Sequence, residues 1–139
     1  MTSPVYLYIS PNGTLPDIAH LSPFRAVVIV DLAVTSEWRA KVSDWLVRSG
    51  CLYMMAWGQD CTLWDDSVDF ANLEQFNYGD IPIDQDVFTT WHANEHLRDA
   101  FYYCKHHATH PAVDLQRNVL LHIAAHSDSS YLLQVFAEA

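Results

Sequence analysis

Continuous apolar runs that alternate with helical segments constrain the fold of this chain more than any other feature. The clearest run covers residues 25–31, where β-branched side chains follow one another without polar alternation. Comparable runs cover residues 51–57, 87–91 and 119–124. Strands that are apolar on both faces need helices on both sides of their sheet. The pattern therefore predicts an α/β fold, a three-layer Rossmann-like or flavodoxin-like sandwich around a mainly parallel sheet of about five strands.

The remaining elements follow from local signals. Residues 5–9 form a further β-prone run, and the loop behind them shows no clear helix, so we expect an edge strand of either direction. A helix is expected between an N-cap at Thr35 or Ser36 and a stop at Gly50. The other helical segments are expected over residues 61–76, 94–109 and 129–139.

Size and composition favour one soluble domain. With 139 residues the chain is long enough for one core and too short for two, so we predict a single α/β domain spanning residues 1–139. Neither a secretory signal nor a stretch of roughly 20 apolar residues is present, so we expect no export and no membrane span. The three cysteines are odd in number and form no CxxC pair, which favours a reducing cytoplasm.

Negative charge is concentrated in one segment. Residues 60–99 carry ten carboxylates and one base, Arg98, and so hold −9 of the formal net charge of −10. This field repels phosphate backbones, which argues against nucleic acid as a partner. It attracts basic protein surfaces and cations instead.

Polar residues follow the expected strands at the places where parallel sheets bind ligands. Such ligands lie beyond the carboxyl ends of the strands, and here those ends carry Asp31, Asp60, Cys61, His92 and His126. Of these, we consider Asp31, Asp60, Cys61 and His92 as catalytic candidates. The alternative is that polar residues only mark the points where strands leave the core for solvent.

Two carboxylates in the expected helix over residues 61–76 suggest a metal site. Asp65 and Asp69 lie four positions apart and so share one helix face. With His92 and Glu95 they form a candidate set for a divalent cation, which binds carboxylate oxygens. The favoured alternative is an acid-rich first helical turn that the helix dipole stabilises, so we predict no cofactor beyond this candidate metal ion.

Cys61 supports a second enzymatic interpretation. It lies at an expected strand-to-helix junction, where a helix N-terminus lowers the pKa of a thiol, and His92 is a candidate base. The neighbouring carboxylate of Asp60 opposes thiolate formation. Cys51 and Cys104 fall on expected core faces, and we expect both thiols to be inert.

The leading functional interpretation is a non-enzymatic binding or regulatory protein. The chain lacks the glycine-rich phosphate loops and the Gly-x-Ser-x-Gly elbow of common nucleotide-dependent enzymes and hydrolases. Its acidic 60–99 face, beside aromatic residues that we expect to be exposed, would meet a basic protein partner, as small acidic immunity or inhibitor proteins do. The alternative is a metal-dependent or Cys/His hydrolase-like enzyme at the strand ends. A third interpretation is self-association through the Tyr/His stripe of the 94–109 helix, by which we mean His96, Tyr103, His107 and His110. The residues expected to contribute to binding are Trp64, Asp65, Asp66, Asp69, Tyr78, Glu95 and His126.

Two segments resemble a known family. They are residues 57–69, which read WGQDCTLWDDSVD, and residues 89–95, which read TTWHANE and lead on to His110 and Pro111. Both are similar to segments of a family of short bacterial proteins of uncharacterised function, and the resemblance covers most of the chain. It implies a bacterial cytoplasmic setting and carries over no catalytic or binding residue.

Overall fold

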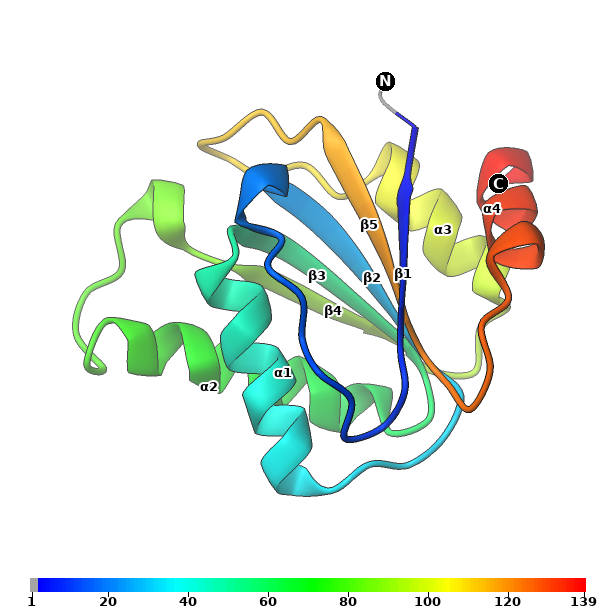
Figure 1. The fold of residues 1–139 in the computed structure, drawn as a ribbon. Coiled ribbons are helices and arrows are strands. Elements are labelled where there is room, and N and C mark those ends of the chain that lie inside the picture. Colours follow the sequence, from blue (N-terminus) through cyan, green and yellow to red (C-terminus); the bar gives the residue numbers. More distant parts are fainter. Residues whose placement is uncertain (1–2) are drawn as a thin grey trace.

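A five-stranded sheet forms the centre of the molecule. The computed structural model describes residues 3–139. Its strands are β1 (Val5–Ile9), β2 (Phe24–Val30), β3 (Cys51–Gly58), β4 (Phe88–His92) and β5 (Arg117–Ile123). They are arranged in the order β1-β5-β2-β3-β4 (Figure 1). Every neighbouring pair is parallel, which confirms the predicted α/β class.

Helices cover both faces of this sheet. They are α1 (Ser36–Arg48), α2 (Cys61–Gln75), α3 (Leu97–His106) and α4 (Ser129–Glu138). The first two pack on one face and the last two on the other, which gives the three layers expected from the sequence (Figure 1). Two short 3₁₀ turns, Ala19–Leu21 and Ile83–Gln85, lie in connecting loops. None of the helices in the described part of the chain is long and apolar enough to cross a membrane.

β2 shows how the core is divided into two layers. All seven of its residues are buried, because β5 pairs with it on one side and β3 on the other. Ala26 and Val28 point toward α1 and α2, whereas Val27 and Ile29 point toward α3 and α4. Because side chains alternate along a strand, a continuous apolar run supplies one apolar layer to each face of the sheet.

Helix boundaries follow local chemistry. α1 begins where Thr35 Oγ1 accepts a hydrogen bond from the Trp38 N–H at 3.2 Å, and this confirms the predicted N-cap. It ends before Gly50, whose φ of +103° suits a residue without a side chain. α3 is shorter than the expected 94–109 segment, because Asn94 takes a left-handed φ of 60° and the helix begins only at Leu97.

β1 enters the sheet as an edge strand and is parallel to β5. The sequence left the direction of this strand open. In the observed register Tyr8 lies beside His122, and Tyr6 is on the same side of β1 as Tyr8. The pairing therefore brings two tyrosine side chains close to a histidine more than a hundred positions later in the sequence.

The chain leaves the neighbouring strands β2 and β5 toward opposite faces of the sheet. From β2 it continues to α1, and from β5 it continues to α4 on the other side. Such a reversal opens a crevice at the carboxyl ends of the two strands, where parallel sheets hold their ligands. The fold thus places a natural binding position between the ends of β2 and β5.

Candidate functional site

The residues predicted at the strand ends all lie along one edge of the sheet. Asp31 follows β2, Asp60 follows β3, His92 ends β4, and His126 comes three residues after β5. Because all strands run parallel, these four positions share the carboxyl edge. They do not form one cluster, because Asp31 and His126 line a common cleft to whose walls neither Asp60 nor His92 contributes.

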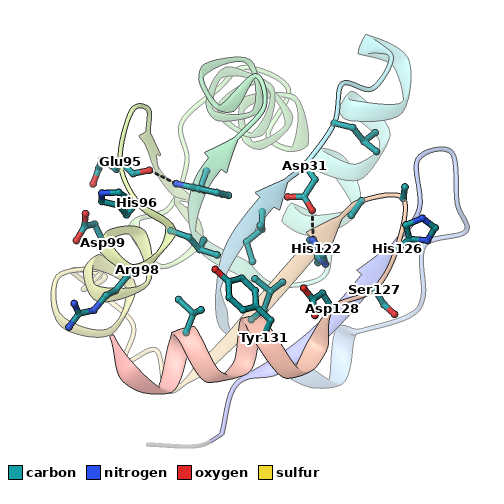
Figure 2. A pocket seen from close by; sticks show the side chains of 18 of the residues that line it. Asp31, Glu95, His96, Arg98, Asp99, His122, His126, Ser127, Asp128 and Tyr131 are labelled. Atoms are coloured by element: carbon teal, nitrogen blue, oxygen red, sulfur yellow. Dashed lines mark hydrogen bonds and ion pairs between the residues drawn. The ribbon is translucent and has the colours of Figure 1, made fainter.

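The cleft opens at the reversal between β2 and β5. Its volume is about 1040 Å³, and its walls are the start of α3, the start of α4 and the loop after β5. Figure 2 shows Asp31 and His122 in its middle, and Asp31 Oδ2 lies 2.8 Å from His122 Nε2. The His122 side chain is 4% exposed, whereas that of Asp31 is 48% exposed. A buried imidazole therefore supports a half-exposed carboxylate.

A chain of hydrogen bonds fixes His122. The backbone N–H of Asp128 donates to the Tyr6 hydroxyl oxygen at 2.9 Å, and that oxygen lies 2.8 Å from His122 Nδ1. Because an ionised carboxylate can only accept a hydrogen bond, His122 Nε2–H donates to Asp31, and in this tautomer of the neutral imidazole Nδ1 accepts the hydrogen bond of the Tyr6 hydroxyl. Burial raises the pKa of Tyr6, which keeps this phenol protonated. The chain of hydrogen bonds thereby holds the Asp31 carboxylate in one orientation.

Tyr6 and His122 carry little sequence signal that marks them as site residues. Tyr6 lies in the β-prone run 5–9 and His122 in the apolar run 119–124, so both look like ordinary strand residues. Only the pairing of β1 with β5 brings them together, and that pairing depends on tertiary structure. The one available signal was a histidine within an otherwise apolar strand.

His92 and Cys61 lie on opposite faces of the sheet and form no nucleophile–base pair, which corrects that interpretation of the sequence. Cys61 is buried in the apolar cluster beneath α1 and α2. His92 is buried on the α3 side, where its ring centroid lies 5.0 Å from that of Tyr103. Its Nδ1 lies 3.1 Å from Glu95 Oε2, and its Nε2 lies 2.9 Å from the Thr90 hydroxyl. His92 and Glu95 are therefore partners of each other within the connection from β4 to α3.

The other two cysteines are core residues, as the sequence predicted. Cys51 and Cys104 are both free and fully buried. Burial raises the pKa of Cys51 to about 12 and that of Cys104 to about 11. Both thiols are therefore protonated and unreactive near neutral pH.

Asp65 and Asp69 of α2 form a carboxylate pair that faces β4. The Thr89 hydroxyl donates to Asp69 Oδ1 at 2.6 Å. The Asp65 side chain is buried, and its Oδ1 has no hydrogen-bond partner. Burial raises the pKa of both carboxyl groups, and the Thr89 hydroxyl offsets part of that increase. A buried carboxylate oxygen without a partner lowers the stability of the free protein.

The four candidate metal ligands do not converge. Asp65 and Asp69 approach β4 from the α2 side, whereas His92 and Glu95 lie on the α3 side. Across the described part of the chain, no three His, Cys, Asp or Glu side chains are placed to hold a metal ion. The shared helix face of Asp65 and Asp69 is real, but the edge strand separates it from the other two candidates.

The aromatic residues of the acidic segment differ from the expectation. Trp64 is fully buried, because it lies on the inner side of α2 together with Val68, so it is a core residue. Tyr78 is exposed as expected and packs edge-on against Phe70, with ring centroids 5.7 Å apart. Trp91 was expected in a buried strand and is 54% exposed, because β4 lies at the edge of the sheet.

The remaining predicted residues lie at the surface. Asp60 precedes α2 with a left-handed φ of 56°, and its side chain does not cap the helix. Asp66 is exposed and lines a groove between α1 and α2. His126 is exposed at the edge of the cleft (Figure 2).

Part of the Tyr/His stripe of α3 is used inside the molecule. The Tyr103 hydroxyl lies 2.6 Å from that of Tyr53 on β3. His110, in the loop after α3, is buried, and its Nε2 lies 2.8 Å from the Asp86 carbonyl oxygen. These two side chains stabilise the fold, so a contact between copies through this stripe would rely on its other members.

Comparison with protein-family models matches residues 5–139 to the family described as Domain of unknown function (DUF7684). The match includes every strand of the sheet and all four long helices. No match was found among curated proteins or among solved structures.

Proposed function

The chain belongs to the family described as Domain of unknown function (DUF7684), and we propose that this member is a protein-binding domain with a regulatory role of the inhibitor or immunity type. Its acidic face, by which we mean the surface formed by α2 and β4, receives a basic, extended segment of a partner protein. Charge and strand-edge pairing together give this contact its specificity.

The carboxylate pair of Asp65 and Asp69 is the observation that carries the proposal, because Asp65 Oδ1 is buried without a hydrogen-bond partner and the exposed Asp69 lies beside it. Leaving such a buried acceptor without a donor costs about 1–3 kcal/mol. The second carboxylate, Asp69, lies one helical turn away and repels the first electrostatically. A lysine or arginine side chain that binds the exposed Asp69 carboxylate neutralises this repulsion. The free protein therefore holds a site that a basic partner completes.

β4 provides the backbone part of the contact. It is an edge strand that pairs only with β3, and its five residues make no other backbone hydrogen bond within residues 3–139. A strand edge with unpaired N–H and C=O groups accepts an extended peptide as an additional strand. The acidic face is therefore open to a partner in the geometry of a sheet.

Trp91 adds an aromatic surface for a cation. It lies two residues beyond Thr89, so both side chains are on the same side of β4, the side that Asp69 contacts. The residue is 54% exposed. A cation over an exposed aromatic ring gains about 0.5–1 kcal/mol, and a basic residue on the added strand meets the ring and the carboxylates together.

The surrounding charge favours the same partner. No lysine or arginine occurs between Asp60 and Glu95, so no lysine or arginine within this stretch competes with a basic partner for its carboxylates. The negative field of this segment also speeds association with a basic partner at low salt.

All three cysteines are free and buried, which supports a reducing compartment, the cytoplasm, as the place of action.

A labelled peptide of alternating lysine and valine tests the proposal by fluorescence anisotropy with the full chain. The Asp65→Asn and Asp69→Asn variants should each bind this peptide roughly tenfold more weakly, because an amide cannot neutralise a lysine. Asp114→Asn removes the same charge from an exposed loop between α3 and β5 and should bind like the unaltered protein. Raising the salt concentration should weaken binding to the unaltered protein.

Equal affinity of all three variants would remove the acidic pair from the contact. Binding of a glutamate–valine peptide as tight as that of the lysine peptide would contradict the proposed charge selectivity.

A further inference from the structure

We infer that the cleft between the ends of β2 and β5 binds a small organic cation, an ammonium or guanidinium group carried on a flat apolar body. The cleft is separate from the acidic face, because neither Asp65 nor Asp69 contributes to its walls. Binding at the two places is independent, so each can be tested without the other.

Asp31 is the anchor for the cation. Its backbone N–H donates to the Ile123 carbonyl at 2.9 Å, and its Oδ2 accepts a hydrogen bond from His122 Nε2–H. No described residue bonds to the other oxygen, Oδ1, and the side chain is 48% exposed. The carboxylate is thus fixed on one side and open to a ligand on the other.

His122 is a positioning residue. Both of its ring nitrogens have partners, Asp31 on Nε2 and the Tyr6 hydroxyl on Nδ1. With the proton on Nε2, the imidazole donates to Asp31 and presents no free acceptor to the cleft. The donated bond holds in place the carboxylate that attracts a cation.

The charge of the cleft favours a cation over an anion. Its walls include five carboxylates and only one arginine, Arg98, whose guanidinium points away from Asp31 in Figure 2. The starts of α3 and α4, which would favour an anion, also border the cleft. Each already has an acid, Asp99 in the first turn of α3 and Asp128 just before α4. The negative charges of these two acids therefore offset the positive dipole ends at the starts of α3 and α4.

The apolar walls define the body of the ligand. Trp57 donates its Nε1–H to the Glu95 carbonyl at 2.8 Å, which fixes the indole ring at one side. The Tyr131 side chain rises from α4 into the cleft (Figure 2), and the residue is largely exposed. An aromatic ring beside a carboxylate is the arrangement that recognises ammonium groups. Further apolar contacts come from Ile29, Leu97, Leu132 and Val135.

Three probes of similar size and different charge test this assignment. Phenethylamine is a cation, 2-phenylethanol is neutral, and phenylacetate is an anion, so calorimetric titration of the full chain isolates the effect of charge. Phenethylamine should bind roughly tenfold more tightly than 2-phenylethanol, and phenylacetate should bind most weakly. Asp31→Asn should remove this preference, and Tyr131→Ala should weaken phenethylamine several-fold without disturbing the Asp31–His122 pair.

Control variants separate this site from the acidic face. Asp69→Asn should leave phenethylamine binding unchanged, just as Asp31→Asn should leave binding of the lysine peptide unchanged. Equal or tighter binding of phenylacetate would identify an anion site at the helix starts and overturn the assignment. Failure of phenethylamine to bind at millimolar concentration, or equal binding to Asp31→Asn and the unaltered protein, would overturn it as well.

Discussion

The Tyr6 hydroxyl joins three parts of the molecule at the residue scale. It comes from β1, contacts His122 on β5, and accepts the Asp128 N–H from the loop before α4. Tyr6→Phe leaves a buried imidazole nitrogen without a partner and removes the acceptor of an exposed backbone N–H. We expect this change to lower the free energy of unfolding by about 1–3 kcal/mol, measured by urea denaturation.

Tyr8→Phe is the matched control for that experiment. The Tyr8 hydroxyl also donates across to the end of β5, to the carbonyl oxygens of Ala124 and Ala125. Its side chain is partly exposed, however, so water replaces the lost donor. We expect a loss below about 1 kcal/mol. Equal losses for the two variants would show that the hydrogen-bond chain through His122 stabilises the fold no more than the exposed Tyr8 hydrogen bond does.

Asp65 shows the opposite behaviour, because its ionisation opposes folding. Burial raises its pKa in the folded protein above the unfolded value of about 3.9. The folded state therefore binds the proton more tightly, and stability is greatest below the unfolded pKa. It falls as the pH rises through the raised folded-state pKa. A site that is costly in the free protein is what a partner-binding residue is expected to show.

Asp65→Asn should remove this pH dependence. The difference in urea midpoint between Asp65→Asn and the unaltered protein should grow in favour of the variant as the pH rises above about 4. Unfolding curves recorded across the acidic and neutral range check this expectation. A difference that stays constant over the whole range would mean that the Asp65 carboxyl titrates alike in the folded and unfolded states.

At the scale of elements, β4 explains why the predicted site residues divide into two groups. Thr89 is on the α2 side of this strand, and His92 is on the α3 side. The sequence predicted the strand and the helix that carries Asp65 and Asp69. It could not predict which side of an edge strand each neighbouring residue would use, because a five-residue edge strand has no strong apolar alternation.

α2 shows the same limit for a helix. Its start and end were predicted within one residue, because Gly58 and the polar segment after it interrupt the apolar pattern. Its buried side was not identified, and Trp64 was assigned to the surface. The apolar spacing in α2 is irregular, with Leu63, Phe70 and Leu73 exposed, so periodicity alone does not identify the inner side.

At the scale of the whole molecule, the fold class was predictable and the strand order was not. Continuous apolar runs predict a parallel sheet covered on both faces wherever they occur in the chain. The position of β1 next to β5 arises from tertiary packing, and it creates the hydrogen-bond chain that holds Asp31. The hydrogen-bond chain therefore combines one residue that the sequence predicted, Asp31, with two that it did not, Tyr6 and His122.

The distribution of charge was also predictable, since it depends only on the sequence. The fold gives it a location, because the carboxylates of α2 meet an open strand edge. The opposite edge of the sheet is β1, which β5, β2 and β3 separate from β4. Its amides therefore serve as an internal reference for peptide binding at β4.

Amide hydrogen exchange with and without the lysine–valine peptide tests the central claim most directly. The peptide should slow exchange of outward-facing amides along β4 and leave β1 unchanged, because only β4 combines an open edge with the acidic pair. Slower exchange at β1, or in α3 and α4 with β4 unaffected, would contradict the claim that the acidic face receives a basic segment.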